Sequence, residues 1–92
     1  MRETEFCRKV LNLGTAGRMT LVYFLLAEET ELAAPGEEYG VEIYVPETGE
    51  RQLVRAVTPS RREAEALLDR IATGFVTPVT LRDVVYDWLC SK

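Results

Sequence analysis

The segment from Met19 to Glu28 most constrains the fold of this chain, because it is apolar on both faces that a strand would present. It is rich in β-branched and aromatic residues, and a short run between two breaks favours a strand over a buried helix. A strand of this kind needs cover on both sides. The side chains expected on one side are Leu21, Tyr23 and Leu25, and those on the other are Val22, Phe24 and Leu26.

Two further strand patterns flank Thr48-Gly49, within the stretch YGVEIYVPETGERQLVRAVTP. A two-residue turn at this dipeptide would pair Glu42 with Arg55 and Tyr44 with Leu53. That register sets apolar residues opposite each other on one face and an ion pair on the other. A three-residue loop with Gly49 in the left-handed region is the alternative, and it would slip the register by one residue.

The N-terminal segment Glu5–Leu13 has no clean hydrophobic period, so helix and strand both fit it in isolation. The glycine-rich break at residues 14–17 resembles a hairpin connection, which favours a strand. After the central strand, residues 29–38 are rich in glutamate and contain Pro35-Gly36, and they are predicted to form a solvated loop. An elongated helical N-terminal third is the alternative to these strands.

The C-terminal third contains the dipeptide Thr-Pro twice, each time ahead of a hydroxyl residue and an amphipathic run. After Thr58-Pro59, Ser60 is the expected helix N-cap, and Glu63 three residues later completes a capping box. Gly74 suits the left-handed position that commonly ends a helix. The apolar residues between these ends recur at the spacing of one helix face, and they are Ala64, Leu67, Leu68, Ile71 and Phe75.

After Thr77-Pro78, Thr80 is the expected N-cap of a second helix, and Val79 and Val84 are spaced to form a hydrophobic staple across it. Each proline keeps the preceding threonine extended, so the repeated dipeptide marks helix starts. We expect Trp88 to be largely buried and to anchor this helix to the sheet. The apolar face of the second helix is Leu81, Val84, Val85, Trp88 and Leu89.

The order of these elements predicts an α+β fold in one domain, residues 1–92. We expect an antiparallel meander of three to four strands, followed by two C-terminal helices packed on one sheet face. The longest apolar run, Met19–Ala27, is far shorter than the roughly 20 residues of a membrane-spanning helix. The N-terminus has no apolar signal core, so we expect a cytoplasmic protein with Cys7 and Cys90 as reduced thiols.

Charge and residue types argue against several classes of function. The net charge of -4 opposes nucleic-acid binding, which uses a basic face. The link between the two helices is longer than the turn of a helix-turn-helix motif, and Asp83 and Asp87 would repel phosphates. The chain has no histidine, so it cannot form a Ser-His or Cys-His pair. Two cysteines alone cannot build a four-ligand zinc site.

Surface carboxylates offer one enzymatic alternative. Asp83 and Asp87 are spaced to share one exposed helix side, which is most often a solvated face. Magnesium binding there would need further carboxylates brought in by the fold, and Glu37, Glu38 and Glu42 are the candidates.

The motifs YGVEI, AVTPS and VTPVTLRDVVYDWL, in that order and with an amphipathic helix between the last two, carry a resemblance. The chain resembles, over about Tyr39 to Leu89, a small uncharacterised domain-of-unknown-function family of clostridia-like Gram-positive bacteria. The resemblance implies a bacterial cytosolic protein of about this length. It implies no activity, ligand or catalytic residue.

The function that the sequence favours is a non-enzymatic protein-interaction or regulatory module. The alternatives are a small-ligand-binding or metal-assisted enzyme and, behind it, a nucleic-acid-binding domain. We expect no catalytic residues, no cofactor, no metal ion, no small-molecule ligand and no membrane contact.

Assembly follows from the two-sided strand. Two short helices can cover one sheet face, so the opposite face predicts a homodimer or a protein partner. The rival is cover from the N-terminal segment, through Phe6, Val10, Leu11 and Leu13. The candidate interface residues are Val22, Phe24, Leu26, Tyr44 and Leu53.

Overall fold

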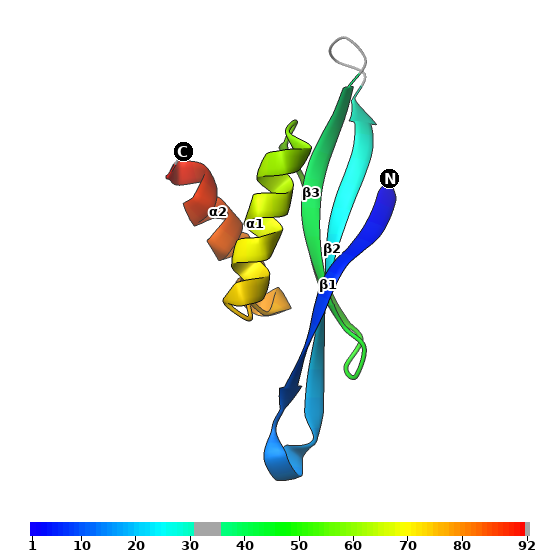
Figure 1. Ribbon diagram of the computed structural model, residues 1–92, viewed down its shortest axis with the longest axis vertical. Coiled ribbons are helices and arrows are strands. Elements are labelled where there is room, and N and C mark those ends of the chain that lie inside the picture. The colour runs from blue at the N-terminus through cyan, green and yellow to red at the C-terminus, as the bar shows by residue number, and fades with distance from the viewer. Residues whose placement is uncertain (31–35, 92) are drawn as a thin grey trace.

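The computed structural model describes residues 1–30 and 36–91, in which four strands precede two helices. All neighbouring strands are antiparallel and follow the order β1-β2-β3-β4, and both helices lie on one side of the sheet (Figure 1). The predicted α+β meander with two C-terminal helices is therefore confirmed. The elements are β1 (Arg2–Asn12), β2 (Arg18–Thr30), β3 (Gly36–Val45), β4 (Glu50–Thr58), α1 (Arg61–Thr73) and α2 (Leu81–Cys90).

The N-terminal third is a hairpin, so its helical alternative is wrong. The connection between β1 and β2 is a short 3₁₀ turn at Gly14–Ala16, closed by a hydrogen bond from Leu13 N to Gly17 O of 2.7 Å. The predicted loop over residues 29–38 is too long, because its two ends extend β2 and β3 and pair with each other. Residues 31–35 of that loop lie outside the described residues.

The core lies between the sheet and α1. Tyr23 fixes the two layers together, because its hydroxyl donates a 2.9 Å hydrogen bond to Val76 O in the link after α1. The interdigitated apolar side chains of the two layers are all buried, and they include Leu21, Tyr23, Leu25, Val41, Ile43, Val45, Ala64, Leu67, Leu68 and Ile71.

Ser60 caps the start of α1 as predicted and its amide donates to Thr58 Oγ1, but the end of the helix is displaced by one residue. Ser60 Oγ accepts a hydrogen bond from Glu63 N at 3.2 Å, while the Glu63 carboxylate accepts from Thr58 Oγ1 at 2.9 Å. Gly74 does not adopt the predicted left-handed conformation; Phe75 does, with φ of 52°. The amide of Val76 donates to the carbonyl of Ile71, which completes a Schellman arrangement around Phe75. Phe75 is consequently turned outward and is 44% exposed.

The start of α2 departs further from the prediction. Thr80 has helical backbone angles and makes no side-chain cap; its hydroxyl donates to Thr77 O at 3.4 Å, within a 3₁₀ turn at Pro78–Thr80. Val79 is 79% exposed, so it does not form the predicted staple. Trp88 is partly buried and packs against the core, and α2 lies against α1 and β4 at the margin of the two layers. Leu89 of the same face is exposed.

The β3–β4 hairpin has a four-residue loop, so both predicted registers are wrong. Glu42 faces Leu53 and Tyr44 faces Arg51, a shift of two residues from the two-residue-turn register. Val45 O accepts from Gly49 N at 2.8 Å, and Gly49 has the left-handed φ of 78° expected for the longer loop. Because side chains alternate with a period of two, a shift of two leaves the side chains of the regularly paired segments, Val41–Val45 and Glu50–Val54, on their predicted faces.

The same pair of strands is interrupted by a bulge. Gly40 lies where β4 approaches closely, and a Cβ there would be 2.3 Å from Val54 O. On the opposing strand Ala56 adopts a φ of 52°, and regular pairing resumes between Tyr39 and Thr58. Bulges increase the local twist of a sheet.

Candidate functional site

The candidate site is the sheet face opposite the helices, which we call the helix-free face. It comprises the predicted interface residues and one acidic residue between them. The pairings Val22 with Tyr44 and Phe24 with Glu42 place neighbouring strands in register, and Leu53 extends the row onto β4. The helix-free face thus consists of Val22, Phe24, Leu26, Glu42, Tyr44 and Leu53.

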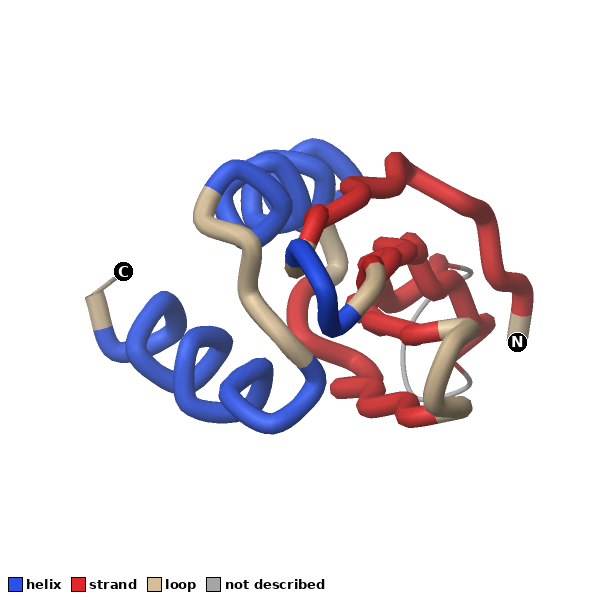
Figure 2. Tube along the Cα trace, turned by 90° about the horizontal axis from the view of Figure 1, so that it is seen from below, coloured by secondary structure: helices blue, strands red, loops and turns tan. Residues whose placement is uncertain are grey.

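The helix-free face is less exposed than predicted. Val22 and Leu26 are only 2% and 1% exposed, while Phe24, Tyr44 and Leu53 are half-buried. The sheet is coiled rather than flat, and the N-terminal end of β1 curves away from the helices (Figure 2). The expectation of a bare patch that contains all five residues is therefore wrong, since the curvature buries two of them within the chain.

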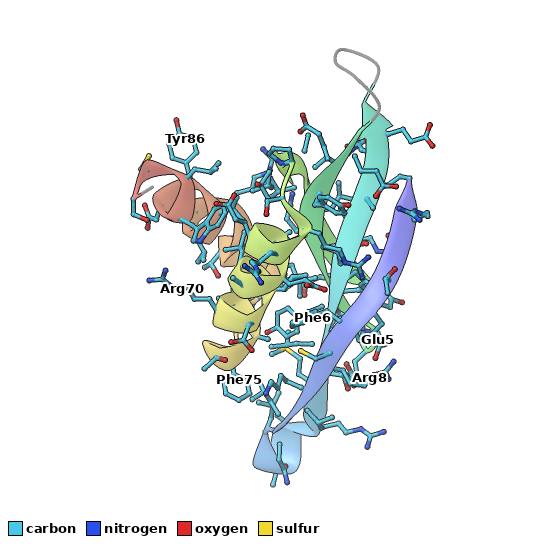
Figure 3. The ribbon with its side chains drawn as sticks, turned by 45° about the horizontal axis from the view of Figure 1, so that its top comes forward. Glu5, Phe6, Arg8, Arg70, Phe75 and Tyr86 are labelled. Carbon is cyan, nitrogen blue, oxygen red and sulfur yellow. The ribbon has the colours of Figure 1, made fainter. Side chains whose placement is uncertain are left out.

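The alternative prediction, that apolar residues of the N-terminal segment cover the helix-free face, is also wrong. Phe6 and Leu11 pack against the helix-facing core, and Phe6 points toward the helices in Figure 3. Val10 and Leu13 remain 59% and 48% exposed. β1 contributes its backbone to the sheet, but these four side chains do not roof the helix-free face.

Glu42 is the unusual residue of this face, because its side chain is fully buried. Arg51 Nε lies 2.7 Å from Glu42 Oε2, and the Arg51 guanidinium also stacks 4.6 Å from the centre of the Tyr44 ring. Neither carboxylate oxygen makes a hydrogen bond of regular geometry within the described residues. Arg51 itself is half exposed, so it carries its charge to water while its stem covers the face.

Burial raises the pKa of Glu42 to about 7, and the adjacent Glu3 carboxyl adds to this increase, whereas Arg51 opposes it. Low-dielectric surroundings favour the neutral form of an acid, and a second carboxyl beside it does the same. The predicted hairpin paired Glu42 with Arg55; instead Arg55 Nη2 lies 2.6 Å from Glu28 Oε2. The available signal for the buried acid was a glutamate in the middle of the apolar run VEIYV.

The surface carboxylates proposed for metal binding are not brought together. Asp83 and Asp87 are exposed on α2. Across residues 1–30 and 36–91, no three His, Cys, Asp or Glu side chains converge in a way that could hold a metal ion.

The thiols of Cys7 and Cys90 are free, and burial raises the pKa of Cys7. None of the described helices is long and apolar enough to cross a membrane.

Nearly the whole sequence, including the residues of all four strands, matches a protein-family model. The model of DUF6514, a family of unknown function, matches residues 2–91. The chain belongs to this family. The match to DUF6514 covers the N-terminal hairpin as well as the segment from Tyr39 to Leu89 that carries the resemblance. No curated protein and no solved structure matches the chain.

Proposed function

We propose that this member of DUF6514 is a non-enzymatic protein-interaction module whose helix-free face binds a protein partner. The observation that carries the proposal is the arrangement on that face: Phe24, Tyr44 and Leu53 stay partly accessible around the ion pair between buried Glu42 and half-exposed Arg51. Aromatic residues and arginine are the types most enriched at the centres of protein interfaces.

The buried carboxyl of Glu42 supports a specific rather than a general role for this face. Burying a carboxylate costs free energy that an apolar residue of similar size would not cost. A strongly perturbed acid at the centre of a surface is a recognised sign of a functional site. Because Glu42 has no exposed surface, its part is to hold Arg51 across the Tyr44 ring and so to fix the shape of the face.

The accessible part of this face favours a partner other than a second copy. A stable interface buries about 800 Å² on each partner. The accessible apolar area of this face is small, because only Phe24, Tyr44 and Leu53 of its defining apolar side chains are accessible and each is half-buried. A larger protein that inserts its own side chains between Tyr44 and Leu53 would supply the missing area. A cytoplasmic, bacterial setting is part of this proposal and rests on the sequence resemblance.

Site-specific photo-crosslinking tests the proposal. A benzophenone amino acid replaces Tyr44 on the helix-free face in one chain and Tyr86, which is 71% exposed on α2, in a matched control. We expect a discrete protein adduct in host cells from position 44, absent from position 86. The adduct should also disappear when Leu53→Asp is added to a chain that keeps its native circular dichroism. Adducts from position 86 alone, or from neither position, would refute the proposal.

A further inference from the structure

The β1 edge is the second surface of interest. Strand β1 pairs only with β2 among the described strands, so the backbone groups along its other side face outward. Unpaired strand edges are templates for another strand. The strand contains neither a proline nor a left-handed residue anywhere along Arg2–Asn12. The opposite edge, β4, is interrupted by the bulge at Ala56 and is followed directly by Pro59.

The charges of β1 are sorted along its length. Its first half carries Glu3 and Glu5, and its second half carries Arg8 and Lys9. Arg2, at the start of the strand, is already engaged in an ion pair with β3. An antiparallel pairing of β1 with itself therefore sets the acidic half of each copy against the basic half of the other. Opposite charges on directly facing residues stabilise a strand pair, and like charges destabilise it.

A bulge in β1 makes this self-pairing geometrically consistent. The register of β1 with β2 shifts between Glu5 and Cys7, which leaves Phe6 as the extra residue. Residues three apart in a regular strand point to opposite faces. Because of the bulge, Glu5 faces Phe24 and Arg8 faces Val22, so both point away from the helices (Figure 3). They already form an ion pair of 2.7 Å within one chain.

We propose that two copies of the chain pair antiparallel along β1, about a two-fold axis between Phe6 and Cys7, into one continuous sheet. In this register Glu5 of each copy faces Arg8 of the other. On dimerisation, the Glu5–Arg8 ion pair within each of the two chains is replaced by an ion pair between the chains. The backbone groups of both β1 edges gain hydrogen-bond partners at the same time. Thr4 and Lys9 face each other on the helix side by the same symmetry. The partner is a second copy because the charge pattern of β1 is complementary to itself.

This dimer leaves the helix-free face available, and in fact extends it. The two four-stranded sheets would become one, with the helix-free faces of both copies on the same side. The dimer therefore adds to the proposed partner-binding role without competing with it. Either proposal can fail while the other stands, since the crosslinking at position 44 does not depend on the edge.

Reciprocal charge exchange tests the β1 dimer. We expect sedimentation velocity to show wild-type dimers that dissociate on dilution. Glu5→Lys alone and Arg8→Glu alone would each raise the dimer dissociation constant by about tenfold, since each places like charges across both symmetric contacts. An equimolar mixture of the two variants should form a heterodimer at the wild-type level, because Lys at position 5 then faces Glu at position 8.

Matched controls and contrary outcomes make the test decisive. Glu50→Lys and Arg82→Glu introduce the same charge changes at exposed positions on β4 and α2, and they should change neither dimerisation nor its response to mixing. Circular dichroism confirms that each variant is folded. A wild-type chain that stays monomeric throughout the dilution series would overturn the proposal. A dimer that is insensitive to both β1 substitutions would also overturn the proposal. If Leu53→Asp then abolished that dimer, dimerisation would be assigned to the helix-free face.

Discussion

Replacing Glu42 with glutamine should change how the stability of this protein depends on pH. The native pKa of Glu42 is about 7, against 4.5 for an unperturbed glutamate such as that of the unfolded chain. Below pH 4.5 the native and the unfolded state both bind the proton, so Glu42 adds no pH dependence to the free energy of unfolding. Between pH 4.5 and 7 the native state keeps a proton that the unfolded state has lost, and the free energy of unfolding falls as the pH rises. Above pH 7 the native state also loses its proton, and the free energy of unfolding stops falling.

The magnitude follows from the difference between the two pKa values. At about 1.4 kcal/mol for each pKa unit, the full loss is about 3 kcal/mol. Since the isoelectric point is near 4.8, measurements are best made from pH 5.5 upward, where the chain is charged and soluble. Between pH 5.5 and 8 about 2 kcal/mol of the loss should be observed in the wild type. Glu42→Gln has no proton to lose, so this part of the pH dependence should vanish.

Urea unfolding followed by circular dichroism at several pH values measures the effect. The quantity to compare is the free energy of unfolding of the variant minus that of the wild type. The cost of burying the glutamine amide does not depend on pH and cancels between pH 5.5 and 8. We expect this difference to rise by about 2 kcal/mol over that range. Glu50→Gln, at an exposed position of β4, is the control and should show no rise. A constant difference for Glu42→Gln would refute a raised native pKa at this position.

Substitutions at four further positions test the local geometry. Gly40→Ala should destabilise the protein by about 1–3 kcal/mol or more, because a Cβ would lie 2.3 Å from a β4 carbonyl oxygen, and thermal unfolding would detect it. Ser60→Ala should cost about 1 kcal/mol, whereas Thr80→Ala should leave the urea midpoint almost unchanged, because of these two only Ser60 caps a helix with its side chain. Phe75→Gly should be more stable than Phe75→Ala by about 1 kcal/mol, because glycine adopts the left-handed conformation without strain; equal stabilities would contradict this assignment.

Local signals predicted the elements, and they failed where geometry between strands decides. The helix face of α1 from Ala64 to Ile71 and the Ser60 cap were predicted correctly because both depend on residues close in sequence, whereas Phe75 does not belong to that face. The β3–β4 register was missed because Thr48-Gly49 was taken as the whole turn. Pro46 was an available signal: it has no amide hydrogen to donate, and the observed loop begins there. The polar ends of β2 and β3 were missed because backbone pairing, rather than an apolar pattern, extends them.

The end of α1 shows a limit of a different kind. Glycine is the residue most often found in the left-handed position after a helix, and Gly74 is present at the right distance. Gly74 instead keeps a negative φ of -84°, and Phe75 adopts the left-handed conformation. The hydrogen bond from Tyr23 to Val76 O connects this turn to the sheet. A contact between residues so far apart in sequence leaves no pattern in the local residues.

The candidate interface was the most consequential expectation, and its outcome depends on sheet curvature. A flat sheet with Val22, Phe24 and Leu26 on one face would leave all of them bare and would favour a face-to-face dimer. The observed sheet is coiled, and the bulge opposite Gly40 increases its twist. Curvature buries Val22 and Leu26, and it also encloses Glu42, whose raised pKa is a consequence of that enclosure.

Curvature also changes which surface is suited to self-association. Because the sheet coils, two copies of the helix-free face cannot approach each other closely along their whole length (Figure 2). An edge strand keeps its unpaired backbone groups whatever the curvature. In this chain the bulge of the β4 edge holds a left-handed residue, Ala56, while β1 has a bulge at Phe6 but no left-handed residue and no proline, and its charges match a second copy of itself. Val22 and Leu26, which suggested a face-to-face dimer, are thus buried within one chain, and the sorted charges of β1 supply the reason to expect an edge-to-edge dimer.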